Sequence, residues 1–548
     1  MIQKKHAGRL AAALVLAAAL TTQTVAAKPV DFDQASVAEL DAAFKAGTLT
    51  SEKLVELCIA RIQAYDRQGP SLHAMITINP KALETARALD AERKAKGPRS
   101  PLHGIPVILK DNYDTDDMQT TGGSVLLEGS IPPDDAFVVQ KLRAAGAIIL
   151  GKANMSEFAS PPNRSSLGGQ SLNPHDLNRS PAGSSSGTGV AIAAGYAPLG
   201  MGTDTGGSIR GPSTANGIVG LKPTHGLLSR NGIIPLSLSF DTGGPMTRNV
   251  ADAAAMLSVM TGVDPGDAAT KKSAGKIQPD YTKFLKADAL KGARIGIARD
   301  FTGFDPDVDW TVNAAIIAMQ KAGATVVEVR FPTWFLSNLF DDIGGVFMTV
   351  LNPEFKVQLS DYLATKTGPK YPKSMEELLQ RSYSFNSVRG DEVGPNPVRW
   401  ADFEDVVKSP PLTDYHYVVA RDYGLPMMRA LVEGMFAAEK LDAIVYPTSP
   451  RRPGLIEATP SGAAAPPSGG VHPTRSATSI ANLTGFPDLI VPAGFTGNGL
   501  PVGISFFGLA FSEPKLFALG YSFEQATHAR RRPVHTPALK DATIEIPN

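Results

Sequence analysis

Two serine-rich segments, about one helix apart, hold the side chains whose types and spacing best suit chemistry. Residues 183–187 read GSSSG, and residues 205–210 read TGGSIR. A serine hydroxyl is a weak nucleophile until a neighbouring group removes its proton. Two questions therefore come first: which serine reacts, and which side chain activates it.

Ser208 directly follows two glycines, Gly206 and Gly207. Glycine adopts backbone angles that other residues avoid, so this turn can point several N–H groups toward one place. Convergent N–H groups beside a serine form an oxyanion hole, which stabilises the negative charge that develops on a carbonyl oxygen. The alternative is a tight turn with a capping serine, which is the commoner use of this composition.

Ser185 competes with Ser208, because residues 183–187 fit Gly-x-Ser-x-Gly, the nucleophile elbow of α/β-hydrolases. That elbow needs a strand immediately before the serine. The preceding residues 176–182, DLNRSPA, are polar and include Pro181, which favours a loop. The sequence therefore favours Ser208.

Lys110 is the candidate base. It lies near the end of an apolar run, residues 104–112, that reads as a buried strand. Burial disfavours the charged ammonium, and lowering a lysine pKa from about 10.4 to about 7 takes roughly 4–5 kcal/mol of desolvation. The alternative role for Lys110 is a salt bridge to Asp111 or to another acid at the end of the sheet.

Other site types are disfavoured. Gly187 precedes Thr188 where a phosphate-binding loop requires lysine. The nine histidines show no spacing typical of metal ligands, so we expect neither a metal nor a cofactor. Basic and acidic residues balance at 53 each, which gives no electrostatic reason to expect a nucleic-acid partner.

Residues 1–27 have the features of a secretory signal peptide. A cationic start precedes the apolar run 10–20, which is shorter than the roughly 20 residues that span a bilayer. Val25 and Ala27 fit the −3 and −1 positions of a cleavage site. We therefore expect a periplasmic or secreted protein without a membrane segment after cleavage; an uncleaved anchor helix is the alternative. The single cysteine, Cys58, cannot form an internal disulfide and is expected to be a buried thiol.

The remaining chain, residues 28–548, reads as one α/β domain. Helical and apolar strand patterns alternate, as in helix 136–145 followed by strand 147–150. Residues 333–435 are predicted to be rich in helix. Residues 450–473, rich in proline, glycine and alanine, are predicted to form a long loop, either a functional lid or disordered.

The order of motifs from residue 183 to 224 resembles the amidase signature family. Gly-Ser-Ser, a helix of small residues, GTDTGGSIR and GIVGLKPT follow one another. The resemblance covers most of the mature chain, is strongest over 100–260 and 478–532, and is closest to bacterial peptide amidases. It implies an α/β fold with a large twisted mixed β-sheet covered by helices on both faces.

The resemblance also implies the roles of the site residues. Ser184 and Ser208 are 24 positions apart, as the family's two catalytic serines are, and Lys110 stands in the family's LKDN context. Ser208 is then the nucleophile, Ser184 the bridging serine on a cis peptide bond after Gly183, and Lys110 the base. The implied oxyanion donors are the N–H groups of four consecutive residues: Thr205, Gly206, Gly207 and Ser208.

Two neighbours, Asp204 and Arg210, are expected to support the reactive loop without reacting. Ala182 and Ser186 stand where the family usually has glycines, which weakens any transfer of substrate preference. Six aromatic residues could line an acyl pocket, although for each one core packing is the preferred interpretation: Trp334, Phe335, Phe340, Phe347, Tyr383 and Phe385.

The expected activity is cofactor-free hydrolysis of carboxamides to an acid plus ammonia or an amine. Peptide C-terminal amides and small aliphatic or aryl amides are the expected substrates, with carbamates and lactam oligomers as alternatives. A second hypothesis is an amidotransferase component that supplies ammonia to a partner, which the signal peptide disfavours. A third is a solute-binding protein. We expect a monomer or homodimer.

Overall fold

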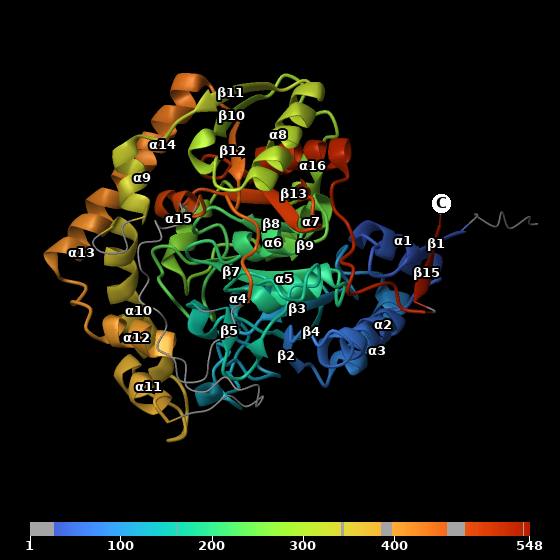
Figure 1. The fold of residues 1–548 in the computed structure, drawn as a ribbon. Coiled ribbons are helices and arrows are strands. Elements are labelled where there is room, and N and C mark those ends of the chain that lie inside the picture. The colour runs from blue at the N-terminus through green and yellow to red at the C-terminus, as the bar shows by residue number, and fades with distance from the viewer. Residues whose placement is uncertain are drawn as a thin grey trace, which may run out of the picture.

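The computed structural model describes residues 27–161, 163–340, 345–384, 397–456, 477–540 and 542–547. Within these ranges, eleven strands form one mixed sheet at the centre of the molecule (Figure 1). In spatial order the strands are β11 (Thr325–Val329), β10 (Arg294–Ala298), β12 (Ala443–Pro447), β14 (Pro501–Phe507), β13 (Asp488–Phe495), β8 (Val219–Lys222), β9 (Thr242–Thr247), β7 (Leu199–Asp204), β3 (Pro106–Lys110), β4 (Ile148–Ala153) and β2 (Met75–Ile78).

Each face of the sheet packs against its own hydrophobic core. Along β12, Ala443 and Val445 belong to one core, whereas Ile444 and Tyr446 belong to the other. This alternation follows from the period of two along a strand. The first core includes residues of α1 (Val37–Ala46), α2 (Ser51–Ile62), α7 (Val250–Met260), α8 (Pro306–Lys321) and α16 (Glu513–Thr527). The second includes residues of α9 (Thr333–Phe340), α10 (Val346–Ala364), α14 (Leu425–Glu439) and α15 (Ser479–Thr484). The predicted α/β fold, with helices on both faces of a large mixed sheet, is confirmed.

The local predictions agree with the structure to within a few residues. The predicted helix 136–145 is α4 (Phe137–Ala144), the strand that follows it is β4, and the run 104–112 contains β3. Cys58 is fully buried in α2. The helix-rich segment is confirmed in its described part, where α10, α13 (Tyr415–Val419) and α14 lie along one side of the molecule (Figure 1).

Three strands near the serine segments were not predicted individually: β7, β8 and β9. They read LGMGTD, VGLK and TGGPMT, with few of the β-branched residues typical of strands. Their glycines allow close packing. A Cβ at Gly200 would lie 2.8 Å from the side chains of Ile192 and Thr188 on α5 (Ser186–Ala193).

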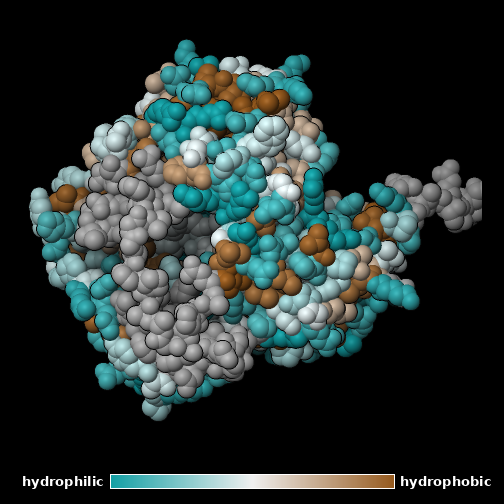
Figure 2. Space-filling model, viewed as in Figure 1, coloured by the Kyte–Doolittle hydropathy of each residue, from teal (hydrophilic) through white to brown (hydrophobic). Residues whose placement is uncertain are grey.

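Both ends of the described chain meet in a small antiparallel pair, β1 (Ala27–Asp31) with β15 (Thr543–Pro547). The predicted signal peptide lies outside the described residues except for Ala27, and most of the predicted loop 450–473 lies outside them as well. None of the described helices is long and apolar enough to cross a membrane. Figure 2 shows hydrophilic residues over much of one face, with hydrophobic residues in scattered groups.

Candidate active site

Lys110 lies at the carboxyl end of β3 with its side chain fully buried. Its Nζ donates to Ser184 Oγ at 2.7 Å and to Thr203 Oγ1 at 2.8 Å. Burial lowers the pKa of Lys110 to about 7, against the opposing pull of the Asp204 and Asp241 carboxylates. The lysine can therefore be neutral near neutral pH, which a general base requires.

The parallel pairing of β3 with β4 and β7 brings the ends of these strands together. Leu109 is opposite Lys152 on β4 and opposite Met201 on β7. Lys110 follows Leu109 directly and Thr203 comes two residues after Met201, so their side chains meet at this end of the sheet. Lys152 Nζ lies 3.4 Å from Asp111 Oδ1. The carboxylate of Asp111, which follows Lys110 in the sequence, is thus paired with Lys152. Lys110 therefore does not form the alternative salt bridge with Asp111.

Ser184 lies in the segment that leads into α5. The peptide bond between Gly183 and Ser184 is cis, in agreement with the resemblance. A Cβ at residue 183 would lie 2.1 Å from Asn163 Oδ1 and 2.5 Å from Ser156 Oγ, so a larger residue would displace these two side chains. The carbonyl of Ser184 accepts from the Ser156 N–H at 3.0 Å. This packing holds the Ser184 hydroxyl at the lysine.

Ser208 lies between β7 and α6 (Arg210–Ala215) and is half-buried. The N–H of Ser185 donates to the carbonyl of Ser208 at 3.2 Å, so the two serine segments lie against each other. Lys110, Ser184 and the Ser208 backbone are therefore gathered in one place, from three separate parts of the chain.

Ser185 has a different role from the one that the nucleophile-elbow hypothesis gives it. Its fully buried hydroxyl donates to the Thr203 carbonyl at 3.2 Å and accepts from the Thr203 N–H at 3.3 Å. Residues 180–185 form no strand, and α5 begins at Ser186. The Ser185 hydroxyl fastens α5 to β7 and is not directed toward a substrate.

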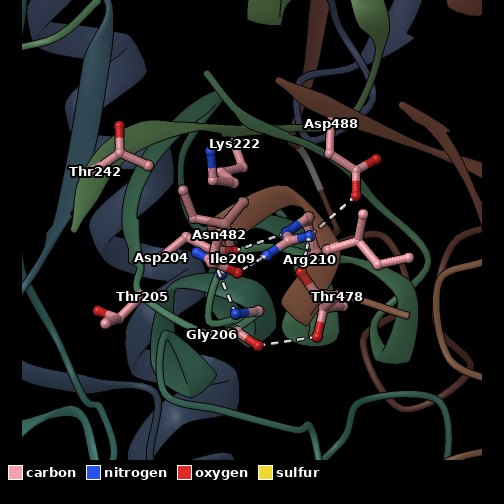
Figure 3. A network of polar contacts seen from close by, with 12 residues as sticks. Asp204, Thr205, Gly206, Ile209, Arg210, Lys222, Thr242, Thr478, Asn482 and Asp488 are labelled. Atoms are coloured by element: carbon pink, nitrogen blue, oxygen red, sulfur yellow. Dashed lines mark hydrogen bonds and ion pairs between the residues drawn. The ribbon is translucent and has the colours of Figure 1, made fainter. Parts of the chain in front are cut away.

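Asp204 and Arg210 hold the turn that carries Ser208 (Figure 3). Asp204 accepts from the N–H groups of Gly207 at 2.9 Å and Ile209 at 3.0 Å. Arg210 donates to both oxygens of Asp204, at 3.0 and 2.9 Å. Burial alone would raise the pKa of Asp204, but Arg210 and the hydrogen bonds hold that pKa well below its usual range. The expected supporting role of this pair agrees with the contacts.

Arg210 also ties the turn to distant parts of the chain. It donates to Asp488 on β13 at 3.0 Å and to the Thr478 carbonyl at 2.7 Å, just before α15 (Figure 3). The Thr478 hydroxyl donates to the Gly206 carbonyl at 2.9 Å. A turn held at so many points is preorganised, which is what an oxyanion hole requires.

The four implied oxyanion donors are not equivalent. The Gly207 N–H donates to Asp204 Oδ1 and is already engaged, which gives Gly207 a supporting role. The N–H groups of Gly206 and Ser208 have no hydrogen-bond acceptor in the described part of the chain. These two groups, with Thr205 before them, remain the predicted donors.

Several site residues were missed by sequence reasoning. Thr203 shares its hydroxyl between Lys110 and Asn112, whose Nδ2 donates at 3.0 Å. Asp241 accepts from Thr205 Oγ1 at 2.5 Å. Alternation along β7 would have indicated Thr203 if that strand had been recognised, but nothing in the sequence links Asp241 to Thr205.

One of the six aromatic candidates, Phe347, lies beside the reactive turn. A Cβ at Gly206 would lie 3.0 Å from its ring, which stacks on Phe240 with centroids 4.8 Å apart. Phe335 is fully buried against Phe331, as core packing predicts. Trp334 and Tyr383 are 43% and 45% exposed. Of the other two, Phe385 lies outside the described residues, as does the side chain of Phe340.

Comparisons with known proteins give the same family as the sequence motifs. The model of the Amidase family matches residues 53–517. A protein of Symbiobacterium thermophilum, named as one of the subunits of glutamyl-tRNA(Gln) amidotransferase, is 36% identical over 509 residues, which cover 91% of this chain and 99% of the relative. A protein of Arabidopsis thaliana named "Probable amidase" is 34% identical over 540 residues, 96% of each chain.

Among solved structures, the native peptide amidase from Stenotrophomonas maltophilia superposes with a TM-score of 0.80. The two sequences are 38% identical, and the match covers 92% of this chain and 99% of the peptide amidase. With the serine and lysine motifs gathered in one site on a matching fold, the chain belongs to the amidase signature family.

Proposed function

We propose that the chain is an exported serine hydrolase that cleaves carboxamides through an acyl-enzyme on Ser208. The observation that carries this proposal is the hydrogen bond from a fully buried Lys110 to Ser184 Oγ. A lysine with its pKa lowered to about 7 can accept a proton from a hydroxyl, and the hydroxyl can take one from a second serine.

The proposed reaction has two halves. Ser208 Oγ attacks the amide carbonyl, and its proton passes through Ser184 to neutral Lys110. The tetrahedral oxyanion is stabilised by the backbone N–H groups of Thr205, Gly206 and Ser208. The C–N bond then breaks, the proton returns through Ser184 to the leaving nitrogen, and ammonia or an amine departs. Water attacks the ester by the same proton route, releasing the acid and restoring Ser208.

For the substrate, we propose peptide C-terminal amides or small aliphatic and aryl amides. The likeness to a peptide amidase supports the first group. The stacked rings of Phe347 and Phe240 beside Gly206 give one wall of the site an apolar, flat surface. Such a wall suits an acyl group that is apolar next to the carbonyl.

Export is proposed from residues 1–27, on the composition described above. The N-terminal sequence of the protein recovered from the periplasm or the medium tests this directly. A mature protein that begins at Lys28 is expected, whereas an intact N-terminus in the cytoplasmic fraction would overturn the proposal.

A second candidate is an ammonia-supplying component of an amidotransferase, favoured by the amidotransferase proteins among the 36%-identical relatives. Such a component would hydrolyse glutamine and co-purify with a partner. Glutamine hydrolysis as the preferred activity, together with a stable heteromeric complex in size-exclusion chromatography, would favour it over a free-standing amidase.

The test of the proposed function is release of ammonia and amine from a small panel of amides. The panel holds an amidated dipeptide, an aliphatic amide and an anilide, and the wild type is compared with Ser208→Ala and Ser185→Ala. Ser185→Ala is the matched control because it removes a hydroxyl one residue from Ser184. Activity lost only in Ser208→Ala is expected. Activity lost only in Ser185→Ala would restore the nucleophile-elbow hypothesis.

A further inference from the structure

The buried carboxylate of Asp241 lies beside the reactive turn and accepts a hydrogen bond from its first residue, Thr205. Its Oδ1 accepts from the Thr205 hydroxyl at 2.5 Å. Its Oδ2 accepts from the backbone N–H groups of Leu236 and Ser237, each at 2.9 Å. Asp241 is 7% exposed, so these bonds form away from bulk water, where they are stronger than at the surface.

Asp241 also lies close to the proton-transfer groups. Together with Thr205, Thr203 and Asn112 it lines a small cavity beside the site. Its negative charge raises the pKa of Lys110, in opposition to the effect of burial. The structure shows no hydrogen bond between the two in its described part, so Asp241 influences the lysine only through its field.

The loop that carries Asp241 is itself anchored from α10. Glu354 accepts from the hydroxyls of Ser237 and Ser239, each at 2.6 Å, and from the hydroxyl of Tyr417 at 2.9 Å. Phe240 stacks on Phe347 of the same helix. Asp241 therefore connects a firmly held loop to the first residue of the turn 205–208.

We propose that Asp241 is a positioning residue that fixes the oxyanion turn through the hydroxyl of Thr205. The inference rests on the proposed function. Thr205 begins the turn, and its hydroxyl has one acceptor in the described chain, Asp241 Oδ1. Without that bond the turn keeps the contacts of Gly207 and Ile209 with Asp204, but its first residue, Thr205, is less firmly held. The N–H groups that should point at the oxyanion are then less well oriented. Oxyanion donors act in the transition state, so their misplacement lowers kcat more than it raises KM.

The test compares Thr205→Val, Thr205→Ser and Asp241→Asn on the best amide of the panel. Valine has the shape of threonine without its hydroxyl, whereas serine keeps the hydroxyl. We expect Thr205→Val and Asp241→Asn to lower kcat by about tenfold to a hundredfold, with KM within about threefold. Thr205→Ser is expected to retain most of the activity.

A pH profile separates positioning from mere stability. Arg230 lowers the pKa of Asp241, and the carboxylates of Asp204 and Asp241 both raise the pKa of Lys110. The Glu354 carboxylate bonds the loop that carries Asp241. Asparagine at position 241 removes one of the two negative charges that raise the pKa of Lys110, and the charge of Asp204 remains. The acid limb of kcat/KM should therefore move to lower pH in Asp241→Asn, while Thr205→Val, which keeps the carboxylate, should leave the limb in place.

Asp252→Asn is the matched control for the loss of a buried carboxylate. Asp252 is also buried and accepts from the Val37 N–H at 2.9 Å. As for Asp241, burial raises its pKa to about 6. It lies on α7, outside the proposed site, so we expect a lower Tm and unchanged kcat.

The inference is overturned if Thr205→Val and Asp241→Asn keep the wild-type kcat and pH profile and lose only Tm, as Asp252→Asn does. It is also overturned if Thr205→Ser is as impaired as Thr205→Val. A wild-type protein that hydrolyses no amide would instead refute the proposed function, so the two failures are distinguishable.

Discussion

Lys110 and Lys222 end two strands of the same sheet and have different hydrogen-bond partners. Both are fully buried, and burial lowers the pKa of each to about 7. Lys110 donates to two hydroxyls, those of Ser184 and Thr203. Lys222 donates to two backbone carbonyls, those of Pro223 at 3.0 Å and Phe486 at 2.9 Å. A hydroxyl can give up a proton and a carbonyl cannot, so only Lys110 can serve as a base.

A third buried lysine, Lys152, completes the comparison. It donates to the Thr120 hydroxyl at 2.9 Å but also faces the Asp111 carboxylate. Burial lowers the pKa of Lys152, whereas the Asp111 carboxylate raises it and so favours the charged form of the lysine. Burial by itself therefore does not distinguish the proposed base. Among these three lysines, Lys110 is the one whose hydrogen-bond acceptors in the described part of the chain are all hydroxyls.

The largest difference in kcat/KM is expected between the variants Lys110→Met and Lys222→Met. Removing the base should lower kcat/KM by about 10⁴-fold, as loss of a member of a catalytic triad does. Lys222→Met should leave kcat/KM within about threefold, because its partners take no part in proton transfer. Kinetics on the same amide, with Tm measured in parallel, check both values. Equal losses in the two variants would break the distinction drawn here.

The pH dependence of the wild-type enzyme follows from the same lysine. Lys110 must be neutral to accept a proton, so kcat/KM should rise with pH, level off above about 7, and fall about tenfold per unit below it. Lys222→Met should show the same acid limb. Rates that stay flat from pH 5 to 10 would count against Lys110 as the base.

Thr203→Val sharpens the comparison by removing one hydroxyl partner of Lys110. Within the described residues the amine then keeps Ser184 as its one acceptor, and Asn112 loses its bond to Thr203 Oγ1. We expect about a tenfold fall in kcat/KM, because the lysine is less firmly aimed. Thr203→Ser serves as the control and should retain activity; equal impairment of the two variants would show that the methyl group matters and the hydroxyl does not.

The smallest effect concerns stability rather than activity. Native Lys222 loses its proton at a pKa of about 7, whereas an unfolded lysine keeps it to about 10.4. In that window the unfolded state binds more protons, so this contribution to stability is complete above about 10.4 and is lost as pH falls toward 7. Lys222→Met should remove a slope of about 1.4 kcal/mol per pH unit from the free energy of unfolding. Denaturant unfolding between pH 7.5 and 10 measures it, and an unchanged slope would place a charged lysine in the native core.

The fold was predictable where pattern and propensity agree. The run before Lys110 and the helix–strand unit 136–150 follow ordinary periodicity, and both lie where they were expected. The strands β7, β8 and β9 were not individually predictable. Their small residues are selected by close packing with helices such as α5, which local propensity does not reveal.

The residues of the candidate site likewise fall into those that the sequence predicted and those that it did not. Lys110, Ser184 and Ser208 could be named because their motifs are specific and their order along the chain is typical of the family. Thr203, Asp241 and Phe347 could not, since each reaches the turn through long-range packing that has no local signature. The engagement of the Gly207 N–H by Asp204 likewise becomes visible only in three dimensions.

The most direct test of the proposed triad is to locate the acyl-enzyme. Wild-type protein is mixed with a slowly deacylating p-nitrophenyl ester, quenched in acid, and analysed by intact mass and peptide mapping. One acyl group on Ser208 is expected, with none in Ser208→Ala and slower formation in Lys110→Met. An acyl group on Ser185 or Ser184, or undiminished labelling of Ser208→Ala, would contradict Ser208 as the nucleophile.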